Sequence, residues 1–151
     1  DVTAVLAPCP GRLVPMTEVP DPVFAAEMVG PGVGIDPDPG DVTVVSPIAG
    51  TAVKVHPHAF VVLGADGVGV LVHLGINTVR LEGRGFDVLV EEGGIVEPGT
   101  PMVRWNPSTV SGPDISPIVL VVAMDQPKGS VPAPEPGSTA VTGETLFVVA
   151  G

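Results

Sequence analysis

The fold of this chain is decided in the stretch Val55-His-Pro-His-Ala-Phe-Val-Val-Leu-Gly-Ala-Asp-Gly-Val-Gly-Val-Leu-Val-His-Leu-Gly75. All three histidines of the chain, His56, His58 and His73, lie within this stretch. Its apolar runs flank an Asp-Gly pair, a pattern typical of a β-hairpin. The sequence therefore predicts a hairpin that carries imidazoles on otherwise apolar strands.

The loop length of this hairpin decides whether two of the imidazoles meet, because side chains alternate between the two faces of a strand. With a loop of two or four residues, His58 faces His73, or it faces Gly75 with His73 one diagonal away. Both registers put the two rings on one face, with Cβ atoms about 4.5–8 Å apart. A three-residue loop without a bulge would separate them. We expect the rings to lie together and to form a site.

The composition predicts one all-β domain over residues 1–151. A chain of 151 residues can bury roughly 70% of its unfolded surface. It contains 20 glycines and 19 prolines, which punctuate short Val-rich runs, while 44% of the residues are hydrophobic. This pattern favours an antiparallel β-sandwich or barrel-sandwich hybrid with many tight turns. Helix is expected to be limited to one turn near Pro22–Met28.

Two pairs of similar segments indicate that the domain is built from duplicated halves. The first motif pair is Ala7-Pro-Cys-Pro-Gly-Arg-Leu-Val14 and Ser46-Pro-Ile-Ala-Gly-Thr-Ala-Val53. The second, weaker motif pair is Val96-Glu-Pro-Gly-Thr-Pro-Met-Val103 and Ala140-Val-Thr-Gly-Glu-Thr-Leu-Phe147. Two copies of a turn-strand unit suit a sandwich or barrel and are too few for a solenoid. A final strand, Thr145 to Ala150, is expected to close the sheet.

The charge of the chain excludes one class of partner. Six basic residues oppose seventeen acidic ones, so the net charge is −11. Binding to a phosphate backbone needs clustered Lys and Arg, so no nucleic-acid partner is expected. An acidic surface instead favours a basic protein partner.

Cysteine usage and hydropathy bear on the compartment. The single cysteine, Cys9, excludes an internal disulfide framework and is compatible with a reducing cytoplasm. It lies between two prolines with no base nearby, so we expect a buried apolar residue rather than a nucleophile. The longest apolar run, Ile118 to Met124, is far below the roughly 18 residues that span a bilayer. No signal segment opens the chain, and because Asp1 is not an initiator Met we expect a processed, trimmed or excised chain.

The histidines permit a metal site as an alternative function. His56 and His58 project to one side if they lie on a regular strand, and His73 would complete a three-imidazole zinc site, as in a zinc-binding hydrolase. Pro57 argues against regular strand geometry between the first two. No Asp or Glu lies within five residues of His58, and Asn77 occupies the position where a His-x-x-x-Asp spacing would need an acid.

A nucleophilic histidine assisted by a second imidazole is the other interpretation. Neutral imidazole is a competent nucleophile near neutral pH, and a neighbouring ring can donate a hydrogen bond to the group that is attacked. Phosphoryl transfer suits such a pair, since it needs positioning and neutralisation of oxygen charge. The sequence has no Walker loop, so we expect a phosphorylated protein as the donor rather than a nucleotide.

Five motifs resemble one family in order and approximate spacing, over about Val5 to Val149. They are Val19-Pro-Asp-Pro-Val-Phe-Ala-Ala-Glu-Met-Val-Gly-Pro-Gly-Val-Gly-Ile35, Val45-Ser-Pro-Ile-Ala-Gly-Thr51, His58-Ala-Phe60, Val72-His-Leu-Gly-Ile-Asn-Thr-Val79 and Leu81-Glu-Gly-Arg-Gly-Phe86. The chain is similar to the glucose-type IIA component of the bacterial sugar phosphotransferase system. The resemblance implies a flattened antiparallel β-sandwich that accepts phosphate from the phosphocarrier protein HPr. It also implies that the phosphate passes to a cysteine on the IIB domain of a sugar permease.

The resemblance assigns the two central histidines. The phosphorylated histidine of the family corresponds to His73, in Val-His-x-Gly-Ile, and reacts through Nε2. The supporting histidine corresponds to His58, in His-Ala-Phe, which would donate a hydrogen bond to the phosphoryl oxygens. No cofactor is implied, although zinc at the pair His58 and His73 remains the alternative.

The resemblance also implies an apolar collar where partners dock. Phe24 corresponds to a collar residue, and we expect Val23, Met28 and Val29 to extend it. Asp21 corresponds to a collar acid that suits a basic partner. A contiguous apolar collar around two polar rings would mark an interface.

Two positions depart from the family pattern. Asn77 stands where many members have Asp, so an ion pair with the partner's arginine is reduced to a hydrogen bond. The loop before His58 is shorter, and a Thr common just ahead of that histidine is missing; His56 is the nearest polar group, without an assigned role. We expect a cytoplasmic chain that docks to a membrane permease without spanning the membrane. The sugar, a regulatory docking role, the oligomeric state, and the choice between a free protein and a domain of a longer permease stay open.

Overall fold

The computed structural model describes residues 2–150 and is built almost entirely of strands. The strands are β1 (Val2–Leu6), β2 (Gly11–Pro15), β3 (Gly32–Pro37), β4 (Val42–Val45), β5 (Gly50–His56), β6 (Ala59–Leu63), β7 (Gly69–Ile76), β8 (Phe86–Val88), β9 (Ile95–Val96), β10 (Pro101–Trp105), β11 (Ser116–Ala123), β12 (Thr139–Ala140) and β13 (Thr145–Ala150). The helical segments are η1 (Met16–Glu18), α1 (Pro22–Ala25), η2 (Thr78–Leu81) and η3 (Pro107–Thr109). The expected all-β fold, the α-helical turn near residue 22 and the final strand are confirmed, whereas the three 3-10 turns η1, η2 and η3 were not predicted.

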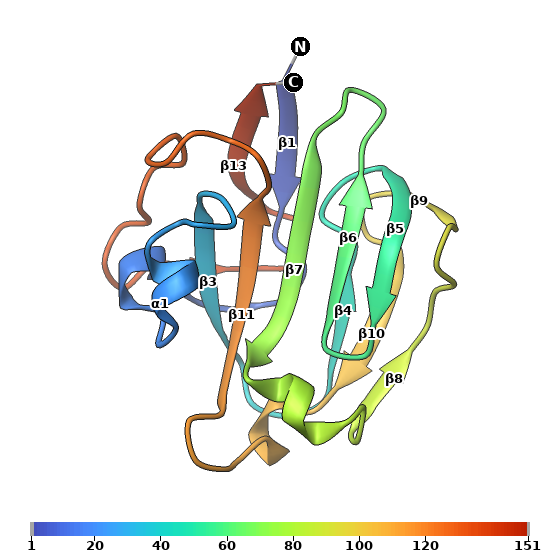
Figure 1. Ribbon diagram of the computed structural model, residues 1–151, viewed down its shortest axis with the longest axis vertical. Helices are drawn as coiled ribbons and strands as arrows, with labels where there is room; N and C mark the ends of the chain where they lie inside the picture. Colours follow the sequence, from blue (N-terminus) through green and yellow to red (C-terminus); the bar gives the residue numbers. More distant parts are fainter. Residues whose placement is uncertain (1, 151) are drawn as a thin grey trace.

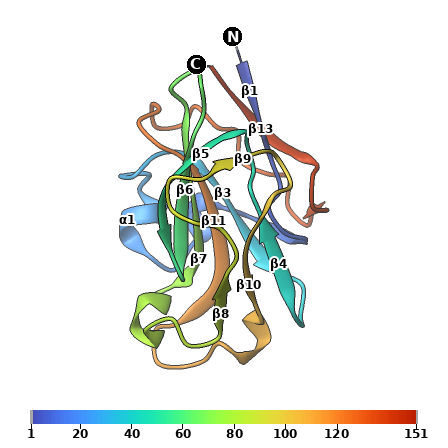
Figure 2. The ribbon, with the colours of Figure 1, turned by 90° about the vertical axis from the view of Figure 1, so that its right-hand side faces the viewer.

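The strands form an antiparallel sandwich. The large sheet has the order β12-β2-β3-β11-β7-β6-β5-β9, and two smaller sheets, β4-β10-β8 and β1-β13, lie behind it (Figure 1). The view turned by 90° shows the two layers edge-on, with β6 and β7 on one side and β4 and β10 on the other (Figure 2). The main core fills the space between them and contains inward side chains of both layers, among them Val72, Leu74, Val103 and Phe147.

A smaller core lies on the outer face of the large sheet. Figure 1 shows α1 beside β3, on the left of the view, and the buried residues of this core are Met16, Val19, Ile76, Leu120 and Val122. The part of the sheet formed by β7, β6 and β5 is not covered by α1 (Figure 1). The edge of this cover therefore lies beside β7, the strand that carries His73.

Backbone hydrogen bonds confirm the duplication that the repeated motifs predict. The Leu6 amide donates to the Pro47 carbonyl at 3.0 Å, and the Val45 amide donates to the Pro8 carbonyl at the same distance. In the first motif pair, Leu6 is equivalent to Val45 and Pro8 is equivalent to Pro47. The two bonds are therefore the same bond made in both directions, as a two-fold axis between the halves would require. Each copy of the first motif is therefore held by the other, because the residue just before one copy hydrogen-bonds to the turn of the other copy.

The second motif pair obeys the same relation. The Ala7 amide donates to the Glu144 carbonyl at 2.7 Å, and the Ser46 amide donates to the Thr100 carbonyl at 2.8 Å. In both halves the second motif thus pairs with the turn of the first. The large sheet has a strand order that fits the same symmetry. Its two central strands, β11 and β7, have three further strands on each side.

The predicted register of the β6–β7 hairpin is wrong. Leu63 lies opposite Gly69, and the Gly64 amide continues the ladder by donating to the Val68 carbonyl at 2.8 Å. Residues 65–67 therefore form a three-residue loop. With a loop of this length, strand alternation alone would put His58 and His73 on opposite faces of the hairpin. Ala59, and not His58, is the residue opposite His73.

The burial of Cys9 and the lengths of the helices agree with the sequence analysis. Cys9 is buried, and burial, followed by the nearby negative charge of Asp38, raises the pKa of its thiol to about 12. A thiol with that pKa is not a nucleophile near neutral pH, as expected. No helix between residues 2 and 150 combines the length and apolar character that crossing a membrane requires.

Candidate functional site

His73 lies on the outer face of the large sheet, near the middle of the sequence of strands. Its neighbours along β7, Val72 and Leu74, are fully buried in the main core, so alternation directs His73 outward. Across the sheet it is flanked by Ala59 on β6 and Leu120 on β11. The imidazole is half-buried, so it sits among apolar groups while one side of it stays accessible.

A backbone carbonyl orients this imidazole. Nδ1 of His73 lies 2.5 Å from the carbonyl oxygen of Gly75. A carbonyl oxygen can only accept, so Nδ1 carries the hydrogen and donates it. In the neutral ring the lone pair then resides on Nε2, which is the nitrogen available for nucleophilic attack.

His58 reaches His73 from a turn rather than from a strand. The β5–β6 hairpin closes between His56 and Ala59, which leaves Pro57 and His58 as a two-residue turn. The ring centroids of His58 and His73 are 5.4 Å apart, with an edge-to-face angle of 74°. The two rings therefore meet as expected, but by a different route, because strand alternation does not apply to a turn residue. Proline favours such a turn position, in agreement with the irregular geometry expected around it.

The electrostatics of the pair favour neutral rings. Burial lowers the pKa of His73 below its ordinary value of 6.5, opposed by the hydrogen bond to Gly75 and the charge of Asp21. Burial, followed by the neighbouring imidazoles of His73 and His56, lowers the pKa of His58. Both imidazoles consequently stay uncharged at neutral pH, which keeps the lone pair of His73 free.

Helix α1 places an aromatic side chain against His73. The carboxylate of Asp21 caps the helix by accepting from the Val23 amide at 2.9 Å and the Phe24 amide at 3.3 Å, and Pro22 follows at the first helical position. The Phe24 ring centroid lies 5.3 Å from that of His73, at 57°. Phe24 is half-buried against the smaller core, so it contributes both to packing and to the accessible rim of the site.

The remaining predicted collar residues differ in how exposed they are. Val23 is 46% exposed and Met28 is 68% exposed, while Val29 is half-buried against the smaller core. Sequence reasoning missed Leu71, which lies two residues before His73 on β7 and therefore on the same outer face, packed against the smaller core. It also missed Val79, which is 59% exposed at the end of the His73 motif. Period-two alternation along β7 is the signal that would have identified Leu71.

Asn77, four residues after His73, makes a hydrogen bond that stabilises the fold. It adopts a left-handed conformation with φ of 61°, which Asn tolerates better than most residues. Its Nδ2 donates to the carbonyl oxygen of Asp114 at 2.8 Å. An aspartate cannot donate this bond, so the departure from the family pattern ties the corner after β7 to the segment that leads into β11.

The third histidine completes a row of imidazoles. His56 is exposed, and its ring stacks on that of His58 with a centroid separation of 5.7 Å and an angle of 25°. Within residues 2–150, no group of three His, Cys, Asp or Glu side chains has the arrangement that could hold a metal ion. The structure thus brings the three rings into sequence along one face without gathering them around a common centre.

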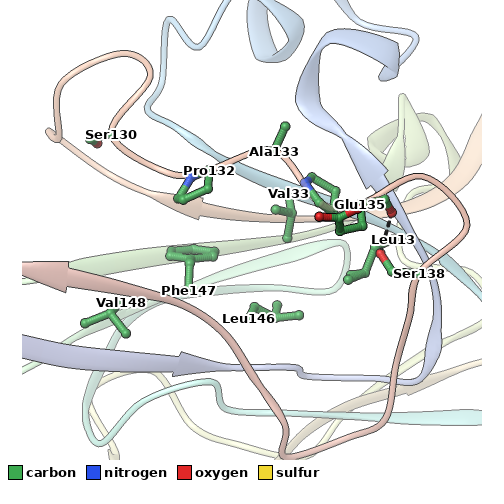
Figure 3. A pocket seen from close by; sticks show the side chains of 11 residues that line it. Leu13, Val33, Ser130, Pro132, Ala133, Glu135, Ser138, Leu146, Phe147 and Val148 are labelled. Carbon is green, nitrogen blue, oxygen red and sulfur yellow. Dashed lines mark hydrogen bonds between the residues drawn. The ribbon is translucent and has the colours of Figure 1, made fainter.

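A separate hollow lies away from the histidines. It has a volume of about 580 Å³ and is bounded by the Pro-rich segment 132–135 and by β13 (Figure 3). Phe147 and Leu146 contribute apolar walls, and Glu135 is the charged side chain that lines it. None of the residues that line this hollow is a histidine.

The β-sandwich of this chain has a close counterpart among solved structures. Glucose permease IIA from Mycoplasma capricolum superimposes with a TM-score of 0.85 at 29% identity, covering 98% of this chain and 96% of that one. The fold is therefore the IIA fold.

The sequences of relatives agree with the fold. The PTS system glucose-specific EIIA component of Staphylococcus aureus (strain COL) is 44% identical over 122 residues, which is 78% of this chain and 72% of the relative. The component of the same name from Staphylococcus epidermidis (strain ATCC 12228 / FDA PCI 1200) is 41% identical over 121 residues, 77% of this chain and 72% of the relative. Residues 3–128 match the family described as phosphoenolpyruvate-dependent sugar phosphotransferase system, EIIA 1. The chain belongs to this family and is a phosphocarrier component of sugar transport.

Proposed function

We propose that this chain accepts a phosphoryl group from HPr on Nε2 of His73 and passes it to a cysteine of a IIB domain. The observation that carries the proposal is the hydrogen bond from Nδ1 of His73 to the Gly75 carbonyl, which leaves the lone pair on Nε2. Lowered pKa values of His73 and His58 add support, because both rings are neutral where the reaction takes place. This role belongs to the cytoplasmic face of the membrane, where the chain docks to a permease.

In the first step, the Nε2 lone pair attacks the phosphorus of phosphorylated HPr. A bond forms between Nε2 and phosphorus, and the bond between phosphorus and HPr breaks with its electron pair returning to HPr. His73 then carries the phosphoryl group on Nε2 while Nδ1–H continues to donate to Gly75. In the second step, a IIB cysteine thiolate attacks phosphorus, and the N–P electron pair returns to Nε2 as its lone pair.

His58 stabilises the phosphoryl oxygens during the second step, the onward transfer to IIB. Its ring meets that of His73 edge-to-face at a centroid distance of 5.4 Å, close enough for an N–H to reach an oxygen on the transferring group. The ring has no other hydrogen-bond partner within residues 2–150, so a donor is available for this purpose. A positioned donor that acts on developing charge is commonly the largest single contribution to such a transfer.

The collar Asp21, Val23, Phe24, Met28, Val29 and Asn77 forms the docking surface for both partners. Val23 and Met28 expose apolar surface, and a net charge of −11 attracts a basic partner. Phe24 contacts the ring of His73, so a partner that docks on Phe24 excludes water from the phosphoryl group.

Mass spectrometry tests the proposal. Incubation with phosphoenolpyruvate, enzyme I and HPr is expected to add one phosphate, on His73, that survives base and is lost in acid. Chasing with a IIB domain should remove it. A phosphate on another residue, or stoichiometric zinc without phosphorylation, would overturn the proposal.

A further inference from the structure

His56 shares a cross-strand row with the reacting histidine. On β5 His56 lies opposite Ala59 of β6, and Ala59 lies opposite His73 of β7. Residues that oppose each other directly point to the same face of a sheet, so His56 and His73 both project outward, two strands apart. Adjacent strands are about 4.8 Å apart, which puts the backbones of the two histidines about 10 Å from each other.

The ring of His58 contacts the rings of both histidines of this row. It is 5.7 Å from the ring of His56 and 5.4 Å from the ring of His73. The residue beneath it in the row, Ala59, has only a methyl group and is 7% exposed. A small side chain at this position leaves the room that the imidazole of the turn residue occupies.

The orientation of His58 depends on its ring neighbours. His73 is anchored by Gly75, whereas neither ring nitrogen of His58 has a hydrogen-bond partner among the residues that the structure describes. His58 is also half-exposed and belongs to a two-residue turn. The ring of His56 stacks on that of His58 at an angle of 25° between the planes, and the ring of His73 meets it at 74°.

We propose that His56 is a positioning residue of the phosphotransfer site, whose ring holds His58 by stacking in its edge-to-face contact with His73. The inference rests on the proposed function, in which the His58 ring donates to the phosphoryl group. His56 lies two strands away from His73, so we assign it no contact with that group. Without the stack, His58 can rotate toward solvent at the outer side of the turn, and its donor leaves the phosphoryl oxygens.

Kinetics of two matched variants test this role. His56→Phe keeps a flat ring for stacking, and His56→Ala removes it. We expect the alanine variant to lower kcat for transfer from HPr to IIB about tenfold with KM for HPr within about twofold of wild type, since misplacement of a catalytic group acts on the chemical step. The phenylalanine variant is expected to restore most of the rate. Equal rates in wild type and the alanine variant, equal losses in both variants, or a change confined to KM would each overturn the inference.

Imidazole NMR of the unphosphorylated proteins separates this inference from the proposed function. In His56→Ala, the ring resonances of His58 are expected to shift toward motionally averaged values, while those of His73 stay unchanged and the melting temperature stays within about 2 °C, because an exposed side chain contributes little to stability. An unchanged His58 ring would overturn the inference while leaving phosphorylation of His73 intact. Absence of phosphate on wild-type His73 would overturn the proposed function and, with it, the catalytic meaning of the stack.

Discussion

The carbonyl oxygen of Gly75 accepts a hydrogen bond from Nδ1 of His73, two residues earlier on the same strand, at 2.5 Å. The chain can turn its carbonyl back toward the ring because Gly75 has φ of +87°, a conformation that side-chain-bearing residues rarely adopt. The tautomer of the reacting histidine is therefore decided by the backbone at the end of β7.

Gly75→Ala is expected to disrupt both the fold of this corner and the chemistry. A Cβ at this position would lie 2.6 Å from the Ser116 carbonyl oxygen and would also collide with the Thr78 methyl group. Together with the positive φ, this strain is expected to lower the free energy of unfolding by about 1–3 kcal/mol and to slow phosphorylation. Thermal melts and phosphate uptake are to be compared with Gly69→Ala, at the other end of β7, where a Cβ meets ordinary contacts at 3.9 Å or more. If Gly75→Ala and the control behave alike, the backbone does not orient His73.

Glutamine at the two central histidines is expected to act at different steps. His73→Gln should abolish phosphate uptake with the fold intact, because only the imidazole nitrogen can form the bond. His58→Gln should retain uptake but slow onward transfer to IIB by about 10²–10³, the usual cost of removing such a donor. Rapid-quench measurement of each half-reaction distinguishes the two variants. Complete loss of both steps in His58→Gln would indicate a damaged fold instead.

The lowered pKa values predict how stability responds to acid. Above about pH 6.5, His58 and His73 are neutral in both the folded and the unfolded chain and do not affect the pH dependence. As the pH falls through that value, the unfolded chain takes up protons first, because the pKa values of both residues are lower in the fold. Stability is thus expected to fall with decreasing pH. Urea unfolding at about pH 7.5 and pH 5 should show a smaller drop in His73→Gln than in wild type; an equal drop would contradict the assigned shift.

Phe24→Ala is expected to weaken docking more than it weakens the fold. The ring is half-buried and lies 5.3 Å from the His73 ring, so partners that reach His73 also cover Phe24. Truncating an aromatic at the centre of an interface commonly costs about 2 kcal/mol or more of binding. KM for HPr should rise strongly, with a modest fall in melting temperature. Val148→Ala, at an exposed position on β13 in the opposite layer, is the control. A large fall in melting temperature with unchanged HPr affinity per folded molecule would assign Phe24 to the core alone.

Asn77→Asp is expected to lower the stability of the fold and to raise the affinity for HPr. The aspartate cannot donate to the Asp114 carbonyl, so the free energy of unfolding should fall by about 1 kcal/mol. The added charge should strengthen pairing with a basic partner, so KM for HPr should fall at low salt and approach the wild-type value as salt is raised. Steady-state kinetics at two ionic strengths check this. A KM that rises at low salt would show that the internal hydrogen bond shapes the docking surface more than the charge does.

Much of the fold could be predicted from the sequence because its determinants are local. Short Val-rich runs between Gly and Pro specify strands and turns, and the final strand has the predicted bounds, Thr145–Ala150. The duplicated motifs correctly predict a domain built from two similar halves, since equivalent residues such as Leu6 and Val45 make equivalent bonds. Family motifs place His58 and His73 in one site, and their catalytic roles stay predictions.

The meeting of the rings was decided by the tertiary structure. Alternation along the hairpin predicts that His58 and His73 come together only in a register that the chain does not adopt. Their rings meet because His58 belongs to a turn, where no strand periodicity applies, and because the small side chain of Ala59 leaves space beside His73. The same holds for His56, whose stacking depends on the pairing of β5 with β6. Residue types and spacing are local properties that a sequence displays, whereas the direction of a turn side chain depends on the packing of three strands around it.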